Sequence, residues 1–421
     1  MLGTACLTAA ASTVALAGPA GAQVSNGSLA APAPLVVSTI TQLQDAIKSA
    51  APGTVIKLKS GTYNGVLNIQ RSGTAALPIT LTNNGDGPVT LTASLRMPSC
   101  GASSPDPNRT ITFGSGASYW TITGLNIRGG IMIMGGNAGK VRHWLNTKSL
   151  DWQARRAVPG RGSYNPTGID SSTPYLQNKV GVPLRPSYGI KIVNNDLSLK
   201  GIHSAMNKRG VIAGNQIHDI ACGVGPGVWL GSYSDGWQLT GNTVHDIAQS
   251  TFKHYMQEGI RIGGSSAYNT VSGNTIYNLP GDGRAFTTDE DGSWNTFTKN
   301  TARNVAIGFN DQMSGWGNFW TYNTVTTFRT SGFGFRMKDA GLKLPSMNSS
   351  TNKSTISCNT ATGGKISLQA GAMMDSTFNR NAFTEVQLSP NLRNYWTSQG
   401  DMWNGSTKPP AQFVNSFTTG C

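Results

Sequence analysis

Three stretches of the chain share one pattern: residues 240–247 read TGNTVHDI, residues 272–279 read SGNTIYNL, and residues 298–305 read TKNTARNV. In each, an Asn is followed two positions later by an apolar residue. The steps between consecutive copies range from 20 to 36 residues. A coil of short strands with loops of variable length tolerates such steps, whereas an α-helical solenoid keeps a tighter period. The full set of copies begins at Asn195, Asn215, Asn242, Asn274, Asn300, Asn323, Asn359 and Asn381.

A second element follows each Asn unit, and in it apolar and polar residues tend to alternate. This period of two predicts short strands with one inward face. Together the two elements predict an all-β fold, a right-handed parallel β-helix in which the repeated Asn side chains stack in one turn. The copies are Ile202-His203-Ser204, Val228-Trp229-Leu230, Ile260-Arg261-Ile262, Phe286-Thr287-Thr288, Ile307-Gly308-Phe309, Phe333-Gly334-Phe335 and Ile366-Ser367-Leu368.

The N-terminal part predicts a cap for this coil. Leu43, Ala46, Ile47 and Ala50 are spaced as on one face of a helix, and Pro52-Gly53 ends the pattern. A solenoid needs such a cap over its open apolar end. We therefore expect a short capping helix and one β-helix domain over residues 23–421, interrupted by an insertion at residues 137–187.

The first 22 residues predict export. They are uncharged, rich in Ala, and end in Ala20-Gly21-Ala22, a small-x-small cleavage pattern. Removing residues 1–22 as a signal peptide leaves an even number of cysteines, which permits disulfides in a secreted or periplasmic protein. Their pairing stays open among Cys100, Cys222, Cys358 and Cys421. No later apolar run is long enough for a membrane span, so we expect no membrane association.

The charge balance points to an acidic partner. The chain has 33 Lys and Arg against 19 Asp and Glu, a net charge of +14. The insertion at residues 137–187 holds eight of these cations against Asp151 and Asp170, a net +6. Export and the Asn- and Thr-rich coils argue against nucleic acid, so we expect an acidic polysaccharide as partner, bound by a monomer.

The opening of the repeat region resembles a known family. The stretches LQDAIKSAAPGTVIKLKSGTYNG (residues 43–65), SGTAALPITLTNNGDGPVTL (residues 72–91) and YWTITGLNIRGG (residues 119–130) are similar to the start of the chondroitinase-B and alginate-lyase group of β-helix polysaccharide lyases. This resemblance implies a lyase that uses a Lys and an Arg, often with Ca²⁺ held by carboxylates.

Aligning the strand copies predicts which residues face outward. One row comprises Met132, His203, Trp229, Arg261, Thr287, Gly308, Gly334 and Ser367. Two positions further along lie Asp289, Asn310 and Arg336, and beyond them Lys208, Asp291, Gln312 and Lys338. Because neighbouring coils are about 4.8 Å apart, this sheet would bring charged groups to a single sugar-binding stretch.

Elimination from a uronic-acid polymer needs a base, a group that neutralises the carboxylate, and an acid. We assign Lys338 or His254 as base and Arg336 or Arg261 as carboxylate ligand. The acidic pair Asp289 and Asp291 could hold Ca²⁺, which prefers oxygen ligands. The candidate substrate-binding residues are His203, Lys208, Trp229, Tyr233, Tyr255 and Asn310.

The sequence therefore predicts a secreted polysaccharide lyase. Two alternatives remain open. One is a β-helix glycoside hydrolase with paired acid and base drawn from Asp289, Asp291 and Asp311, since neighbouring coils can supply the carboxylate separation that hydrolysis needs. The other is a carbohydrate-binding solenoid without catalytic activity.

Overall fold

A computed structural model describes residues 33–102, 106–147, 152–251, 257–312, 315–335, 353–370, 376–388 and 421. By its internal contacts the chain divides into two units, Met1–Ala31 and Pro32–Cys421. The predicted signal peptide at residues 1–22 lies outside the described residues. The described strands and helices all belong to the second unit.

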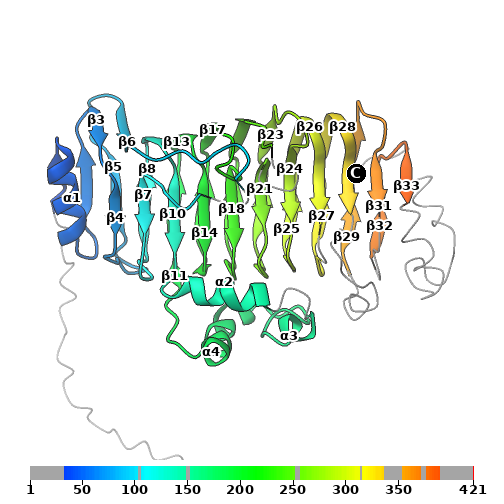
Figure 1. Ribbon diagram of the computed structural model, residues 1–421, viewed down its shortest axis with the longest axis horizontal. Coiled ribbons are helices and arrows are strands. Elements are labelled where there is room, and N and C mark those ends of the chain that lie inside the picture. Colours follow the sequence, from blue (N-terminus) through cyan, green and yellow to red (C-terminus); the bar gives the residue numbers. More distant parts are fainter. Residues whose placement is uncertain are drawn as a thin grey trace, which may run out of the picture. The chain divides into compact units, whose positions relative to one another are not determined.

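Three parallel ladders of short strands wind along the chain (Figure 1). In the described residues the first ladder is a sheet of twelve strands. Its members are β1 (Leu35–Val37), β2 (Val55–Leu58), β5 (Ile79–Asn83), β8 (Trp120–Thr123), β12 (Lys191–Val193), β16 (Val211–Ala213), β19 (Gln238–Thr240), β22 (Thr270–Ser272), β25 (Thr296–Thr298), β27 (Phe319–Thr321), β29 (Thr355–Ser357) and β32 (Thr377–Asn379).

The second and third ladders form one continuous set of paired strands, because two long strands take part in both. The second ladder contains β3 (Gly61–Asn64), β6 (Val89–Thr92), β9 (Asn126–Arg128), β13 (Asp196–Leu199), β17 (Gln216–Ile220), β20 (Thr243–Ile247), β23 (Thr275–Tyr277), β26 (Thr301–Asp311), β28 (Thr324–Phe335) and β30 (Thr360–Thr362). The third contains β4 (Leu67–Ile69), β7 (Ile111–Phe113), β10 (Ile131–Met134), β14 (Ile202–Ala205), β18 (Val228–Gly231), β21 (Glu258–Ile262), β24 (Arg284–Thr288), then β26 and β28 again, β31 (Leu368–Ala370) and β33 (Val386–Leu388). A short pair, β11 (Ser187–Tyr188) with β15 (Asn207–Lys208), lies outside both.

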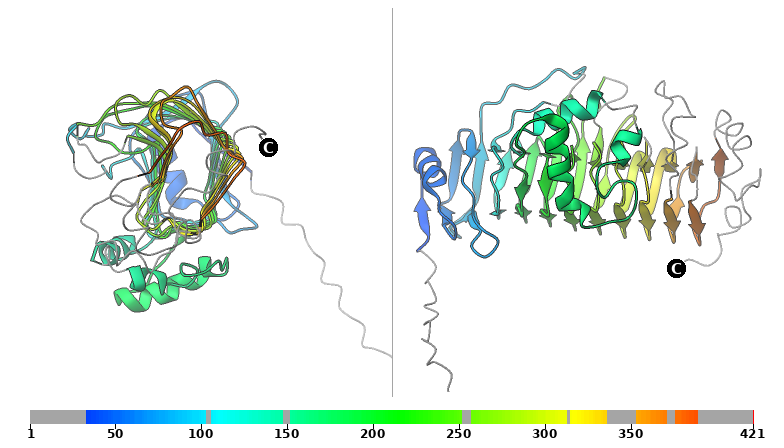
Figure 2. Two further views of the ribbon diagram at one scale, coloured as in Figure 1. Left: turned by 90° about the vertical axis from the view of Figure 1, so that its right-hand side faces the viewer. Right: turned by 90° about the horizontal axis from the view of Figure 1, so that it is seen from below.

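Each coil contributes one strand to each ladder, so the predicted right-handed parallel β-helix is confirmed. Seen end on, successive coils superpose into one outline (Figure 2). Inward side chains stack from coil to coil; the ring of Phe309, for example, is 4.9 Å from that of Phe286 and 4.8 Å from that of Phe333, centroid to centroid. Burying each such side chain contributes roughly 1.5–3 kcal/mol, and the repetition of this term along the coil holds the stack together.

The predicted Asn ladder is present and continuous from Asn195 to Asn381. In each step the side-chain Nδ2 donates to the Oδ1 of the next Asn at 2.9–3.1 Å. The same Nδ2 also donates to a backbone carbonyl of the turn, as Asn274 does to Leu239 at 2.9 Å. All of these amides are buried, so each depends on its neighbour for hydrogen bonds that water does not supply.

A second Asn ladder, which the repeat pattern did not predict, lies one turn away. Asn269 donates to Asn295 at 2.9 Å, and Asn295 donates to Asn318 at 3.3 Å. Each member stands five positions before a member of the first ladder. This constant offset of five residues is visible in the sequence and could have predicted the second ladder.

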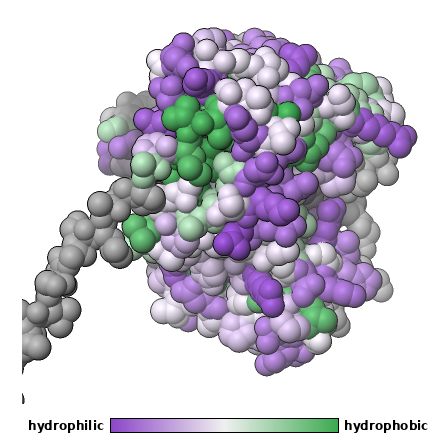
Figure 3. All heavy atoms as spheres, turned by 90° about the vertical axis from the view of Figure 1, so that its left-hand side faces the viewer, coloured by the Kyte–Doolittle hydropathy of each residue, from purple (hydrophilic) through white to green (hydrophobic). Residues whose placement is uncertain are grey.

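The capping helix is α1 (Ile40–Ser49), which begins at the N-cap Thr39. Leu43, Ala46 and Ile47 are its buried residues, as their spacing predicts. The Thr39 hydroxyl accepts a hydrogen bond from the Gln42 backbone N–H at 3.2 Å, which satisfies one free donor of the first turn. On the face at this end, hydrophilic residues dominate and apolar ones form small patches (Figure 3).

The insertion between β10 and β11 folds into helices and does not remain a solvated basic loop. Its helices are α2 (Ala138–Thr147), α3 (Trp152–Arg156) and α4 (Gly168–Val180), and they lie outside the coil outline (Figure 2). Val141, Leu145 and Leu176 of the insertion pack with Met206 and Tyr233 of the coils in a second apolar cluster. The insertion is therefore an integral part of the fold.

Two disulfides connect distant parts of the chain. Cys100 pairs with Cys222, and Cys358 pairs with Cys421. The first fixes the segment after β6, which runs past several later strands in Figure 1; we call the described part of residues 93–110 the strap. Lys200 of the coil donates hydrogen bonds to the Asp106 carboxylate of the strap and to the Arg96 carbonyl, the latter at 3.2 Å.

No helix in the described residues has the length and apolar character to cross a bilayer.

Candidate functional site

A row of outward side chains crosses the third ladder, one residue from each strand. Strand pairing places these residues opposite one another on consecutive coils. We call them the outer row: Met132, His203, Trp229, Arg261, Thr287, Asn310 and Gly334. Neighbouring members are separated by the strand spacing of about 4.8 Å, which is close to the length of one sugar unit in an extended chain.

The predicted register is confirmed up to Thr287 and is wrong beyond it. The residue opposite Thr287 is Asn310, not Gly308, and Gly334 pairs with Gln369, not Ser367. The segment Ile307-Gly308-Phe309 alternates correctly in either register, so alternation alone could not decide between them. Ile307 lies opposite Arg284, two positions before the predicted partner Phe286.

His203 and Trp229 are neighbours in the outer row. Their rings are stacked, with centroids 4.2 Å apart and planes 7° from parallel. The Arg261 guanidinium lies 5.0 Å from the Trp229 ring centroid, and that of Arg142 on α2 lies 5.7 Å from it. Neighbouring side chains flank the Trp229 ring and 8% of the residue is exposed, and the predicted stacking of a sugar on this ring stays a prediction.

The imidazole of His203 is held in its neutral form. Burial lowers its pKa well below the ordinary value, and the charges of Arg109, Arg142 and Arg261 lower it further. Arg109 belongs to the strap and Arg142 to the insertion, so both covering elements contribute to this environment. A neutral imidazole has one ring nitrogen with a free lone pair, which can take a proton.

Several polar atoms of the outer row are buried without a hydrogen-bond partner in the described part of the chain. They come from four coils, two on either side of the coil of Arg261, and all belong to one row. An unpaired buried polar group is costly, and a ligand that supplies partners relieves this cost. The atoms are His203 Nδ1, Trp229 Nε1, Thr287 Oγ1 and Asn310 Nδ2.

An ionic cluster surrounds Arg261, a member of the outer row. The guanidinium contacts Glu258 Oε2 at 3.2 Å and Asp289 Oδ2 at 2.6 Å. Glu258 Oε1 in turn lies 3.6 Å from Arg284 and accepts a hydrogen bond from Gln312 at 3.2 Å. Arg261 is thus neutralised by two carboxylates, which makes it a weaker carboxylate ligand than the sequence suggested.

The residues predicted to bind Ca²⁺ do not fit that ion. Asp289 is engaged by Arg261, and the fully buried Asp291 is 2.7 Å from the guanidinium of Arg156. Within the described ranges, no three His, Cys, Asp or Glu side chains are grouped so that they could hold a metal. We derive no step through a metal ion.

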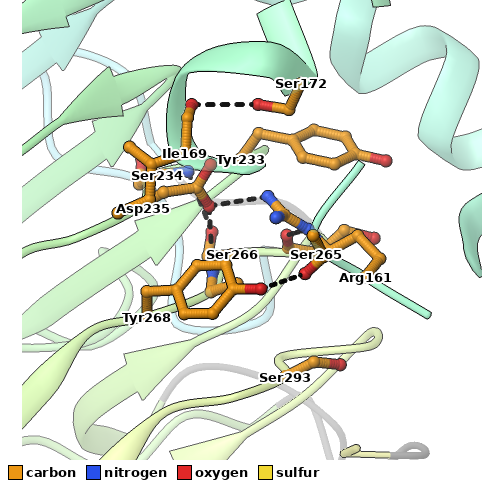
Figure 4. A network of polar contacts seen from close by, with 12 residues as sticks. Arg161, Ile169, Ser172, Tyr233, Ser234, Asp235, Ser265, Ser266, Tyr268 and Ser293 are labelled. Atoms are coloured by element: carbon orange, nitrogen blue, oxygen red, sulfur yellow. Dashed lines mark hydrogen bonds and ion pairs between the residues drawn. The ribbon is translucent and has the colours of Figure 1, made fainter. Parts of the chain in front are cut away.

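Two predicted substrate-binding residues, Lys208 and Tyr233, are buried. Figure 4 shows Tyr233 beside Arg161 of the insertion and Asp235 of the coils. Lys208 Nζ contacts Asp235 Oδ2 at 2.5 Å, and Asp235 Oδ1 is 2.8 Å from Arg161. The Arg161 guanidinium also lies 4.8 Å from the centroid of the Tyr233 ring. Lys208 is 1% exposed and Tyr233 has no exposed surface. Their assignment to substrate binding is corrected: both anchor the insertion.

Other predicted site residues cannot be placed. Arg336 and Lys338, and likewise His254 and Tyr255, lie outside the described residues.

Asp311, which the sequence suggested for hydrolysis, does not belong to the outer row. It shares a register position with the inward residue Thr288 and with Phe335 of the core.

The charge of the insertion divides into two groups. Arg155, Arg156 and Arg161 are turned into the structure; Arg155, for example, donates to the Glu290 carbonyl at 3.1 Å. The exposed cations are Lys140, Arg142, Lys179 and Arg185. Sequence counting could not separate the groups, because the distinction depends on which side chains meet a buried acceptor. Of the exposed cations, Arg142 reaches the outer row.

Three kinds of comparison relate the chain to known proteins. Residues 163–333 match a family model described as periplasmic copper-binding protein (NosD). No curated protein matches the chain. Similar solved structures include an alginate lyase from Paenibacillus sp. str. FPU-7, at 17% identity and a TM-score of 0.47, covering 79% of this chain and 94% of that one.

Two further structures belong to different enzyme classes. The pectate lyase Pel9A is 13% identical with a TM-score of 0.45, covering 80% of this chain and 73% of its own. A family 28 exopolygalacturonase from Yersinia enterocolitica is 14% identical, also with a TM-score of 0.45, covering 84% and 75%. The predicted likeness to β-helix polysaccharide lyases is present, and it extends equally to a hydrolase.

Proposed function

We propose that the protein acts on an anionic polysaccharide laid along the outer row, and that it cleaves a uronic-acid linkage by β-elimination. The observation that carries the proposal is the series of unpaired polar atoms along one row, which begins at a neutral histidine among arginines. A polymer with hydroxyl and carboxylate groups at each unit supplies partners at this spacing, and the surrounding arginines favour a negatively charged one.

In the proposed reaction, the Arg142 guanidinium binds the uronate carboxylate and makes the proton at C5 more acidic. His203 Nδ1 takes that proton. The electron pair forms the C4–C5 double bond, and the C4–O4 bond breaks. The bound carboxylate offsets the arginine charges around His203, which raises the basicity of the imidazole when substrate is present. The oxygen leaving C4 needs a proton donor. The sequence assigned Lys338 or His254 as base, and with His203 in that role we propose one of them as the donor.

A hydrolase is the second candidate, and one observation favours it. Glu258 and Asp289 lie on neighbouring coils and contact the two terminal nitrogens of the same guanidinium. This arrangement places two carboxylates beside the outer row, as paired acid and base catalysis requires. This pair replaces the pairing of Asp289 with Asp291 or Asp311 that the sequence suggested.

A panel of substrates distinguishes the candidates. Purified protein is incubated with alginate, glucuronan, pectate, chondroitin and neutral glycans, and each mixture is followed by ultraviolet absorbance and by reducing-end assay. Elimination yields both new reducing ends and the absorbance of an unsaturated uronate. Reducing ends without that absorbance would overturn the lyase proposal in favour of hydrolysis, and no product from any substrate would favour a binding solenoid.

Three further predictions belong to this proposal. The two disulfides fit an oxidising compartment, so we expect a secreted or periplasmic protein. The Ca²⁺ that the sequence suggested has its own test: because Asp289 and Asp291 are paired with arginines, EDTA should leave the rate unchanged. Loss of activity with EDTA would instead support a bound metal ion. Because Lys338 is a predicted catalytic group, replacing it with Ala should reduce turnover by about 10²–10⁴.

A further inference from the structure

A cavity of about 350 Å³ lies between the insertion and the first ladder, away from the outer row. The insertion contributes Tyr164, Pro166 and Ile169 to its wall, and the start of the first-ladder strands β22, β25 and β27 forms the floor. No residue of the outer row lines it. The proposed reaction therefore does not account for this cavity.

Aromatic rings dominate the cavity lining. The Tyr164 ring centroid is 5.7 Å from that of Tyr268 and 5.8 Å from that of Trp294, with both pairs edge to face. Tyr164 is 63% exposed and Phe319 is 38% exposed. Exposing large aromatic side chains to water in this way costs free energy. A ligand that stacks on the rings removes this cost.

Hydrogen bonds hold two of these rings, those of Tyr268 and Trp294, in place. The Tyr268 hydroxyl donates to the Gly160 carbonyl at 2.8 Å and accepts from the Asn165 backbone N–H at 2.9 Å. The Trp294 Nε1–H donates to the Arg161 carbonyl at 3.3 Å. Their orientation is thus fixed before any ligand arrives, which lowers the entropic cost of binding.

The cavity has polar groups but little net charge. Thr270, Thr296 and Phe319 occupy equivalent positions on consecutive coils, so hydroxyl groups and an aromatic face follow one another at the strand spacing. The charged lining residue is Arg209, whose guanidinium is paired with Asp170 at 2.5 Å. Aromatic faces beside hydroxyls, with charge compensated, suit a sugar ring without a carboxylate.

We propose that this cavity is a second glycan-binding site, which takes the uncharged pyranose rings of a polysaccharide. The site is separate from the outer row and does not depend on the proposed elimination. The same insertion serves both: Arg142 reaches the outer row, and Tyr164 forms a wall of the cavity. Such a site holds the protein on a neutral glycan while the outer row acts on an acidic one.

Isothermal titration with neutral hexasaccharides of glucose, xylose, mannose and N-acetylglucosamine tests the proposal. At least one should bind, with an affinity that does not change with salt. Tyr164→Ala and Phe319→Ala should each weaken binding about tenfold, as expected for loss of a stacked ring. Tyr322→Ala is the matched control, since Tyr322 is 51% exposed and does not line the cavity.

The test separates this site from the outer row. His203→Gln should leave hexasaccharide binding unchanged, and Tyr164→Ala should leave activity on a short soluble acidic substrate unchanged. Four results would overturn the proposal: no hexasaccharide binds, binding survives both cavity variants, only acidic oligosaccharides bind there, or Tyr164→Ala abolishes a dimer, which would identify the cavity as an interface between copies. Unchanged thermal unfolding of the exposed-residue variants shows that they are folded.

Discussion

Arg161 of the insertion and Asp235 of the turn after β18 form an ion pair with 2.8 Å between nitrogen and oxygen, and neither side chain has exposed surface. Asp235 also holds Lys208 and accepts the backbone N–H of Ala267 at 2.9 Å. One carboxylate therefore joins the insertion to three segments of the coil region. The electrostatic attraction of the two cations outweighs burial and lowers the pKa of Asp235.

Replacing Asp235 with Ala should destabilise the fold by about 3–5 kcal/mol, because two cations would remain buried without a counter-charge. Chemical denaturation measures this loss. Asp170→Ala is the control: its pair with Arg209 is about half exposed, and such pairs contribute roughly 0–1 kcal/mol. Equal effects of the two substitutions would show that the buried pair does not anchor the insertion.

Replacing Asn274 with Ala should cost about 1–3 kcal/mol, because the buried amide of Asn242 would lose its acceptor. The free energy of unfolding in urea reports the loss. Asn68→Ala in β4, where the side chain is exposed, should cost much less. A ladder that contributes nothing to stability would give the two variants the same unfolding midpoint.

The sequence predicts the ladder because each coil presents the same surroundings to its Asn, so one residue type recurs. It does not predict the register near Gly308, since Ile307 and Phe309 both satisfy an apolar position. The pairing of β26 with β28 also shifts register between Val305 and Ile307. A uniform repeat does not predict such a shift.

The candidate site is less predictable than the fold. The sequence identifies His203 and Asn310 because outward positions follow from the strand period. It misassigns Lys208 and Tyr233 because the insertion covers them, and the fold of the insertion is not repetitive. It presents Arg142 only as part of a basic segment, since nothing in the sequence shows which cation reaches back to Trp229.

Asp311 should make stability depend on pH. Burial raises its pKa to about 7 from 3.8. Between about pH 4 and 7 the folded protein therefore holds a proton that the unfolded chain has lost. The stability that protonated Asp311 contributes is complete below about pH 4 and is lost as the pH rises through 7. The difference amounts to up to about 4 kcal/mol. Asp311→Asn should remove this slope, which denaturation at a series of pH values measures; an unchanged slope would exclude Asp311 as its source.

Binding of an acidic polysaccharide should weaken with salt, and Arg142 should account for part of the slope. Arg142→Ala should reduce affinity roughly three- to tenfold at low salt and flatten the dependence on ionic strength. Lys179→Ala on α4 is the control, because its ammonium lies 5.3 Å from the Tyr175 ring centroid, within its own helix. If the two variants bind alike at every salt concentration, Arg142 is not a ligand of the polymer.

The rate at which His203→Gln forms unsaturated uronate tests the central claim most directly, with His218→Gln as a histidine control on the second ladder. If His203 takes the C5 proton, its substitution should lower turnover by about 10²–10⁴ with little change in thermal stability, whereas His218→Gln should retain wild-type turnover. Wild-type turnover by folded His203→Gln would contradict the account, because the neutral histidine of the outer row would then have no part in the reaction.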